Sequence, residues 1–194
     1  MRPKRQPQSS PPPRRPTPTE LRAARGRRVP DIVAPHLKIL FVGINPGLYS
    51  GAVGHHFARP GNRFWPALQR AALTPRLFAP GEERELLKSG IGITNIVNRT
   101  TAAASELSKK ELASGGQRLA AKIKRLKPRV VAFLGIDAYR SAFGGRQVRV
   151  GLQPVAIGTA RIWVLPNPSG LNAHYQIKDF ARLFRHLRAT LHTQ

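Results

Sequence analysis

The sequence predicts an α/β fold, a three-layer α/β/α sandwich around a central, largely parallel sheet. Short apolar runs of strand length alternate with longer segments of helical periodicity, and this alternation is typical of parallel sheets with crossover helices. The apolar runs contain few polar residues, as expected for strands that are buried on both faces. With 194 residues, the chain has the length of one compact domain with a short tail.

The N-terminal part divides into a tail and a helix. Residues 1–16 are rich in proline and arginine and have no apolar anchor beyond Met1, so we expect a disordered basic arm that contacts phosphates without reading sequence. In Thr17-Pro18-Thr19-Glu20, the threonine can cap a helix and the glutamate completes a capping box. This helix is short, because Gly26 ends it. We expect residues 17–194 to form a single domain.

The remaining elements follow in order along the chain. Apolar runs predict buried strands, and Gly151–Thr159 adds an irregular edge segment. The expected strands are Lys38–Gly43, Ile91–Val97, Val130–Leu134 and Arg161–Leu165. Amphipathic segments predict helices, and the longest of them has lysine and arginine on its outer face. The expected helices are Asn62–Ala72, Glu82–Lys88, Ser108–Leu126, Asp137–Phe143 and Gln176–Leu191. A long loop is expected over residues 44–61.

Composition limits the classes of function. The formal net charge is +24, with 33 lysines and arginines against nine carboxylates, and so basic a chain attracts polyanions. No apolar stretch has the length of a transmembrane helix, so we expect no membrane partner. The absence of cysteine excludes disulfides, thiolate nucleophiles and cysteine-bound metals. We expect a cytoplasmic, nucleoid-associated protein.

Three loops should meet at the carboxyl ends of the strands, where ligands bind in such sheets. They follow Gly43, Ile93 and Leu165, and none contains a carboxylate. This excludes paired-carboxylate hydrolysis, carboxylate-held magnesium and a Ser-His-Asp triad. His55 and His56 are adjacent, so their side chains diverge, and no third ligand has suitable spacing. We therefore expect neither a metal nor a cofactor.

What remains in these loops is asparagine, glycine, backbone amide and aromatic residues. Gly43-Ile44-Asn45-Pro46-Gly47 puts an amide side chain at a strand end. Pro46 fixes the backbone, and Gly47 permits a tight turn and the close approach of a ligand. Taken singly, each of these motifs is more typical of a turn or a core than of chemistry.

Their combination resembles the mismatch-specific uracil and thymine DNA glycosylases. The matching segments appear in order and cover roughly residues 17 to 190. They are GINPGL (Gly43–Leu48), GHHFARPGNRFW (Gly54–Trp65), GITNIVNRTT (ending at Thr101), SKKEL…GG (Ser108–Gly116) and WVLPNPSGL (Trp163–Leu171). The resemblance implies the uracil-DNA glycosylase-like fold and a monomer that acts on double-stranded DNA containing G·U or related mismatches. It also implies monofunctional excision of uracil, with thymine and other damaged pyrimidines as further substrates.

The resemblance also implies roles for individual residues. Asn45 positions the catalytic water, since an amide can orient water but is a weak base. Leu171 is the wedge that fills the stack after base flipping. Other pocket residues are Ile44, Gly47, Ser50 against the pyrimidine edge, His56, Phe57 stacking on the base, and Asn95. The DNA-binding set adds Asn167, together with Ser169, Gly170 and Asn172, of which the last three are expected near the opposite guanine.

Two other functions stay open at this point. One is a non-catalytic nucleic-acid-binding module on the same fold. The other is a small-ligand α/β enzyme that uses Gly43–Gly47 as a phosphate loop, although this segment lacks the GK[ST] ending of a Walker loop and the GxGxxG spacing of a dinucleotide site. Excision of uracil from a G·U duplex separates the three hypotheses.

Overall fold

The computed structural model describes residues 14–145 and 147–191. One sheet has the strand order β2-β1-β3-β5-β4, in which β4 pairs antiparallel with β5 and every other pair is parallel. The strands are β1 (Ile39–Gly43), β2 (Ile91–Asn95), β3 (Val130–Leu134), β4 (Gly151–Ile157) and β5 (Ala160–Leu165). The predicted largely parallel sheet is therefore confirmed, with an antiparallel edge strand where an irregular segment was expected.

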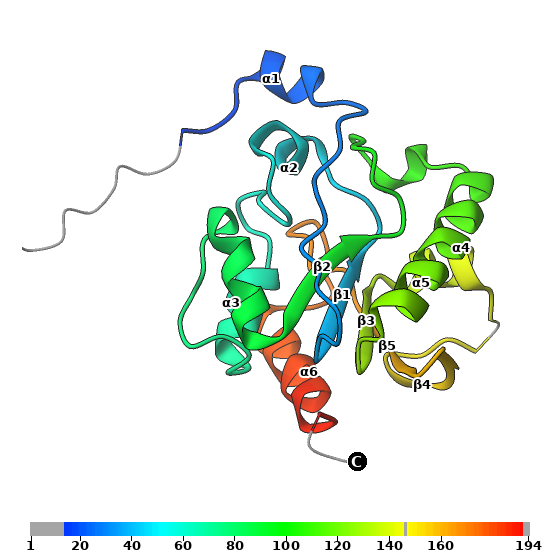
Figure 1. Ribbon diagram of the computed structural model, residues 1–194. Helices are drawn as coiled ribbons and strands as arrows, with labels where there is room; N and C mark the ends of the chain where they lie inside the picture. Colours follow the sequence, from blue (N-terminus) through cyan, green and yellow to red (C-terminus); the bar gives the residue numbers. More distant parts are fainter. Residues whose placement is uncertain (1–13, 146, 192–194) are drawn as a thin grey trace, which may run out of the picture.

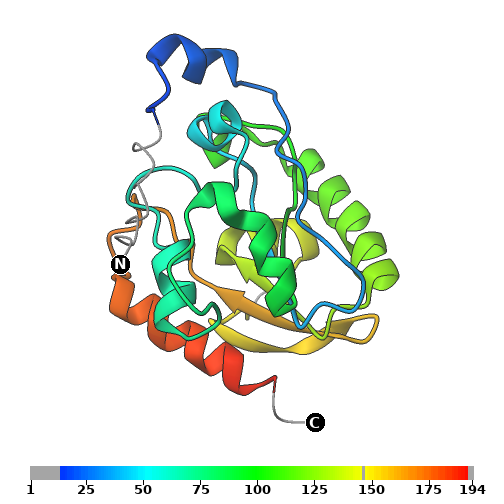
Figure 2. The same cartoon turned by 60° about the vertical axis from the view of Figure 1, so that its left-hand side comes forward.

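Helices cover both faces of this sheet (Figure 1). The α-helices are α1 (Pro18–Ala23), α2 (Leu48–Val53), α3 (Phe64–Arg70), α4 (Lys109–Leu126), α5 (Ile136–Phe143) and α6 (Ile177–Ala189). The 3-10 helices are η1 (Pro80–Ser89) and η2 (Ala104–Glu106). Helices α1 and α2 lie at one end of the molecule and the last turn of α6 at the other (Figures 1 and 2).

The two cores follow from the alternation of side chains along each strand. In β1, Ile39 and Phe41 pack in the core that contains α3, η1 and α6. The intervening Leu40 and Val42 pack in the core that contains α4 and α5. One strand thus contributes to two hydrophobic layers, which confirms the three-layer sandwich.

The 44–61 segment differs from expectation, because it contains α2 within the predicted loop. The six-residue helix begins after Gly47 and ends at Gly54, whose φ is 78°. So short a helix with a central glycine is not stable alone. It forms against its neighbours: a Cβ added to Gly51 would lie 2.5 Å from Thr100 Oγ1. Tertiary packing, which the sequence pattern does not contain, forms α2.

The other elements agree with expectation except in detail. The predicted helix at 82–88 is the 3-10 helix η1 and begins earlier, at Pro80. Strand β2 ends two residues before the predicted Val97, although Ile96 N still donates to Gly43 O at the end of β1 and Val97 N donates to Ile44 O just after it. The Thr17–Glu20 capping box is present. Of the predicted arm, residues 1–13 lie outside the described part of the chain.

Candidate active site

A cleft of about 870 Å³ opens at the carboxyl ends of β1 and β2. The loops after β1, β2 and β5 all contribute to its wall, as the position of these strand ends predicts. Of the residues expected in the site, those that line the cleft are Ile44, Asn45, Gly47, Ser50, His56, Phe57, Asn95, Asn167, Ser169, Leu171 and Asn172. Gly170 lies beside this wall instead, where an added Cβ would come within 2.9 Å of Gly61 O.

The Asn45 amide is held in one orientation. Its Nδ2 lies 2.7 Å from Thr101 Oγ1, 3.0 Å from Arg99 O and 3.2 Å from Pro46 O. Backbone carbonyls only accept hydrogen bonds, and the Thr101 hydroxyl donates its own hydrogen to Ala103 O at 2.8 Å. The amide nitrogen must therefore face these three acceptors. This leaves Oδ1 as the part of the amide that can accept a hydrogen bond from a molecule in the cleft.

His56 and Asn95 form a second oriented pair. His56 Nε2 lies 2.9 Å from Pro30 O, so this nitrogen carries the proton and donates. His56 Nδ1 is then an acceptor, and it lies 3.4 Å from Asn95 Nδ2. The Asn95 amide is thereby fixed with its Oδ1 directly over Gly43, where a Cβ would collide with it. Gly43 is the residue that leaves room for this carbonyl group.

Burial keeps His56 neutral. The side chain is 2 % exposed, and desolvation lowers its pKa below the usual value of 6.5, against the opposing effect of the Pro30 carbonyl. A neutral imidazole is what the hydrogen bonds at Nε2 and Nδ1 require. His56 thus positions Asn95 and is not a proton donor to substrate at neutral pH.

This environment predicts that stability decreases on mild acidification. The unfolded chain binds a proton at His56 below about pH 6.5, whereas the folded chain resists it, so the free energy of unfolding falls as pH drops below 6.5. The slope has an upper limit of about 1.4 kcal/mol per pH unit. Thermal unfolding of wild type, His56→Gln and His186→Gln between pH 7.5 and 5.5 measures this. The exposed His186 is the matched control, and an unchanged slope in His56→Gln would contradict the prediction.

Phe57 has an unusual backbone conformation, with a φ of 52°. Its ring stacks at a tilt on Phe64, with a centroid distance of 4.3 Å, and lies at the wall of the cleft. The residues on either side are tied down: Ala58 N donates to Ser50 Oγ at 3.2 Å, and His56 N donates to Glu83 Oε2 at 2.8 Å. These two bonds hold the ring in place despite the strained φ.

Glu83 is a residue that sequence reasoning missed. It comes from η1, its side chain is 6 % exposed, and its second oxygen lies 3.0 Å from His55 Nδ1. A carboxylate therefore supports the loop from behind without lining the cleft. No spacing motif connects Glu83 with His55, because the two residues are 28 positions apart and meet only through the packing of η1.

The loop that follows β5 presents Leu171, which is 75 % exposed. Arg63, also missed from sequence, braces this loop through Nη1 to Ser169 O at 2.8 Å and to Asn172 O at 2.9 Å. Its backbone N–H also donates to Pro168 O at 2.9 Å. An exposed leucine at the tip of a rigid loop is suited to insertion into a partner. The sequence feature that could have identified Arg63 is its position within the GNRFW motif.

The chemistry of the wall is amide, hydroxyl, aromatic and guanidinium. Within the described ranges, the wall contains neither a carboxylate nor a lysine, and Arg15 and Arg59 are its charged residues. No group of three or more metal-ligating side chains occurs in the part of the chain that the structure covers. Nor does any helix described here have the length and apolarity to cross a membrane. Such a wall can orient neutral molecules and bind phosphates.

The fold is similar to that of the solution NMR structure of a candidate uracil DNA glycosylase from Methanosarcina acetivorans. The TM-score is 0.56 with 21 % sequence identity, and the match covers 84 % of this chain and 98 % of that chain. This likeness shows that the two chains share the same α/β fold.

Residues 30–188 match the profile of the Uracil DNA glycosylase superfamily, and the chain belongs to that superfamily. This membership gives the protein a uracil-DNA glycosylase-like role, the hydrolysis of N-glycosidic bonds in DNA. The matched range begins after α1 and contains the sheet, nearly all of α6 and every residue that lines the cleft except Arg15 and Leu21.

Proposed function

We propose that the protein is a monomeric, monofunctional DNA repair glycosylase that flips uracil out of a G·U mismatch and excises it with a water molecule positioned by Asn45. The observation that carries this proposal is the fixed Asn45 amide, whose nitrogen faces three acceptors and whose Oδ1 is left for a ligand. A protein that only bound DNA would not require this orientation.

The proposed reaction breaks the bond between N1 of the base and C1′ of the deoxyribose. The bonding electrons leave with the base, and the sugar acquires oxocarbenium character. Water held by Asn45 Oδ1 adds its oxygen to C1′ and loses a proton to solvent. An amide is too weak a base to deprotonate water beforehand, so the gain comes from orientation. Backbone N–H groups in the Gly43–Gly47 loop would stabilise the charge on the departing base.

Recognition of the base is assigned to Phe57 and Asn95. The Phe57 ring offers a face for stacking. Asn95 Oδ1 is an acceptor, because its amide nitrogen faces His56. Uracil and thymine carry a hydrogen on N3 and can donate to this oxygen, whereas N3 of cytosine is itself an acceptor. Phe57 and Asn95 together therefore favour the deaminated base over cytosine. Ser50 lies in the same wall of the cleft.

The DNA contacts are assigned to the Leu171 loop. Flipping leaves a gap in the stack, and an exposed apolar side chain can fill it. Leu171 has the exposure for this role, and Arg63 gives its loop rigidity. Backbone groups of Ser169, Gly170 and Asn172 would then contact the opposite guanine.

A substrate panel tests the proposed function. Duplexes with uracil or thymine opposite guanine, uracil opposite adenine, and an ordinary G·C pair are incubated with excess protein and analysed before and after alkali. We expect alkali-labile sites to form fastest in the G·U duplex and not at all in the G·C duplex. Strand breaks before alkali would contradict hydrolysis without a lyase step. Equal rates for G·U and A·U would contradict the mismatch preference.

Replacing Leu171 with alanine is expected to slow excision from duplex DNA and leave excision from single-stranded uracil DNA unchanged, because a wedge acts only where a stack exists. The measurement is the ratio of the two single-turnover rates. Leu77→Ala is the matched control, since Leu77 is an exposed leucine outside the cleft wall. An equal loss on both substrates would show that Leu171 belongs to the pocket.

A further inference from the structure

The charge of the protein is distributed unevenly between the two ends of the sheet. Eight of the nine carboxylates take part in an ion pair with a lysine or an arginine, and the ninth, Glu83, lies 3.0 Å from His55 Nδ1. Several of them occupy first turns of helices, among them Glu111 in α4, Asp137 in α5 and Asp179 in α6. In a parallel α/β fold these first turns lie at the carboxyl ends of the strands, on the side of the cleft.

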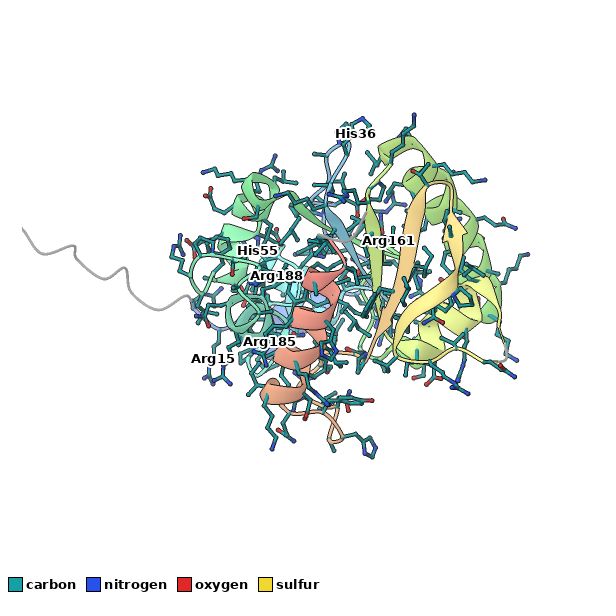
Figure 3. All side chains as sticks on the ribbon, turned by 90° about the horizontal axis from the view of Figure 1, so that it is seen from below. Arg15, His36, His55, Arg161, Arg185 and Arg188 are labelled. Atoms are coloured by element: carbon teal, nitrogen blue, oxygen red, sulfur yellow. The ribbon has the colours of Figure 1, made fainter. Side chains whose placement is uncertain are left out.

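The amino ends of the strands carry a second, almost purely cationic surface, which we call the distal basic face. Its residues are Lys38, Lys124, Lys127, Arg129, Arg161 and Arg185. Hydrogen bonds connect the segments that carry them: Arg129 N donates to Leu37 O at 2.8 Å, and Arg161 N donates to Arg129 O at 3.1 Å. Figure 3 looks at this end of the molecule and shows Arg161 and Arg185 on it.

The cations of this face are not neutralised. Lys38, Lys124, Lys127 and Arg129 are exposed and have no ion pair with any residue that the structure describes. The Arg185 guanidinium donates to a backbone carbonyl, Arg70 O, at 3.3 Å, and Arg161 likewise reaches Thr190 O. Glu85 on η1, which leads into β2 at this end, is already paired with Lys88 at 2.7 Å.

We infer that the distal basic face is a second binding surface for duplex DNA, separate from the cleft. Exposed, unpaired lysines and arginines recognise phosphates without reading sequence. The large apolar residues exposed in the described chain are Leu77, Leu152, Val155 and Leu171. Val155 lies at the edge of this face, next to Ala156, the register partner of Arg161. None of the six residues that define the face is apolar, so the face lacks the broad apolar patch that membrane insertion needs.

The two surfaces lie at opposite ends of the strands, so one short duplex cannot reach both. Duplex DNA is stiff over about 150 base pairs, so wrapping a short segment round the domain is unfavourable. A protein bound to one duplex through the cleft would therefore hold a second duplex on its distal face. With two binding surfaces, the enzyme can transfer from one DNA segment to another while it stays bound to at least one of them.

The inference is tested by bridging of two labelled duplexes. A 12-base-pair G·U duplex carries a donor fluorophore and an undamaged duplex of equal length carries an acceptor. Wild type is expected to bring the two together and give energy transfer at low salt. The triple variant Lys124→Gln, Lys127→Gln, Arg129→Gln should lose this signal. The binding constant of the second duplex is also measured at several salt concentrations. If all three residues contact phosphates, the slope of its logarithm against the logarithm of the salt concentration should be shallower in the variant by about 2 to 3.

A matched control has the same loss of charge outside this face: Lys110→Gln, Arg118→Gln, Arg149→Gln, all exposed. It should keep the energy transfer, and both triple variants should excise uracil from a saturating short duplex at the wild-type rate. Equal loss of bridging in both triples would overturn the inference in favour of net charge. Binding to polyglutamate without any bridging would overturn the nucleic-acid assignment. Because bridging is measured without catalysis, absent excision with intact bridging would reject only the proposed function.

Discussion

Asn45→Ala is expected to lower the single-turnover rate of uracil excision by about a hundredfold or more, because water would no longer be held in line with C1′. Affinity for an undamaged or G·U duplex should be unchanged, since Arg15 and Arg59 of the cleft wall remain, as does Leu171, to which we assign DNA contact. Single-turnover kinetics and a gel-shift titration on the same duplex measure the two quantities. Excision at the wild-type rate would contradict the role given to Asn45.

A second variant separates orientation from mere presence of the amide. Thr101→Val removes one of the three acceptors that face Asn45 Nδ2 and keeps the two backbone carbonyls. Its rate is expected to fall between those of wild type and Asn45→Ala. Thermal unfolding of each variant should accompany the kinetics, because a rate loss that follows the melting temperature would indicate misfolding and not misplaced water.

Gly43→Ala is expected to reduce excision by about ten- to a hundredfold while the protein still folds. The added Cβ would collide with Asn95 Oδ1 and meet Phe57 Cζ at 3.4 Å, so the Asn95 side chain must move from its place beside His56. The colliding atom is the end of a side chain that can rotate, which is why the fold tolerates the change.

Gly81→Ala is the matched control for this substitution. A Cβ at Gly81 has only one neighbour, His55 Nε2, at an ordinary 3.7 Å, so excision and stability should both stay at wild-type values. Single-turnover rates and melting temperatures of the two alanine variants are compared. An active Gly43→Ala protein would show that the position of Asn95 Oδ1 is not needed for base recognition.

Much of the fold could be predicted because the strands are short, continuous apolar runs. The 130–134 strand agrees residue for residue, and the Ser108 capping box marks the start of α4. The α2 helix could not be predicted, because it depends on the contact of Gly51 with Thr100. Local propensity contains no information on such a contact.

In the candidate site, the motif residues could be predicted from the sequence, and the residues that support them could not. The motif residues after β1, β2 and β5 gather in one cleft because parallel strands end at one edge. The supporting residues were missed. Glu83 comes from a helix that packs behind the cleft, and Arg63 acts through two backbone carbonyls of a loop about a hundred positions away. For Glu83 no motif marks this role, whereas Arg63 lies within the GNRFW motif, which does not itself indicate that the residue binds a distant loop.

The backbone of Phe57 has a consequence for any effort to make this protein more heat-resistant. A non-glycine residue in the left-handed region costs about 1 to 2 kcal/mol, but glycine at position 57 would remove the ring that packs on Phe64 and against the core and would raise the entropy of the unfolded chain, so the melting temperature is expected to fall. That ring is also the one that we assign to base stacking. The strained backbone at this position is therefore not a useful target for stabilisation, because the same ring serves both packing and the proposed base stacking, and a screen for robust variants should keep phenylalanine there.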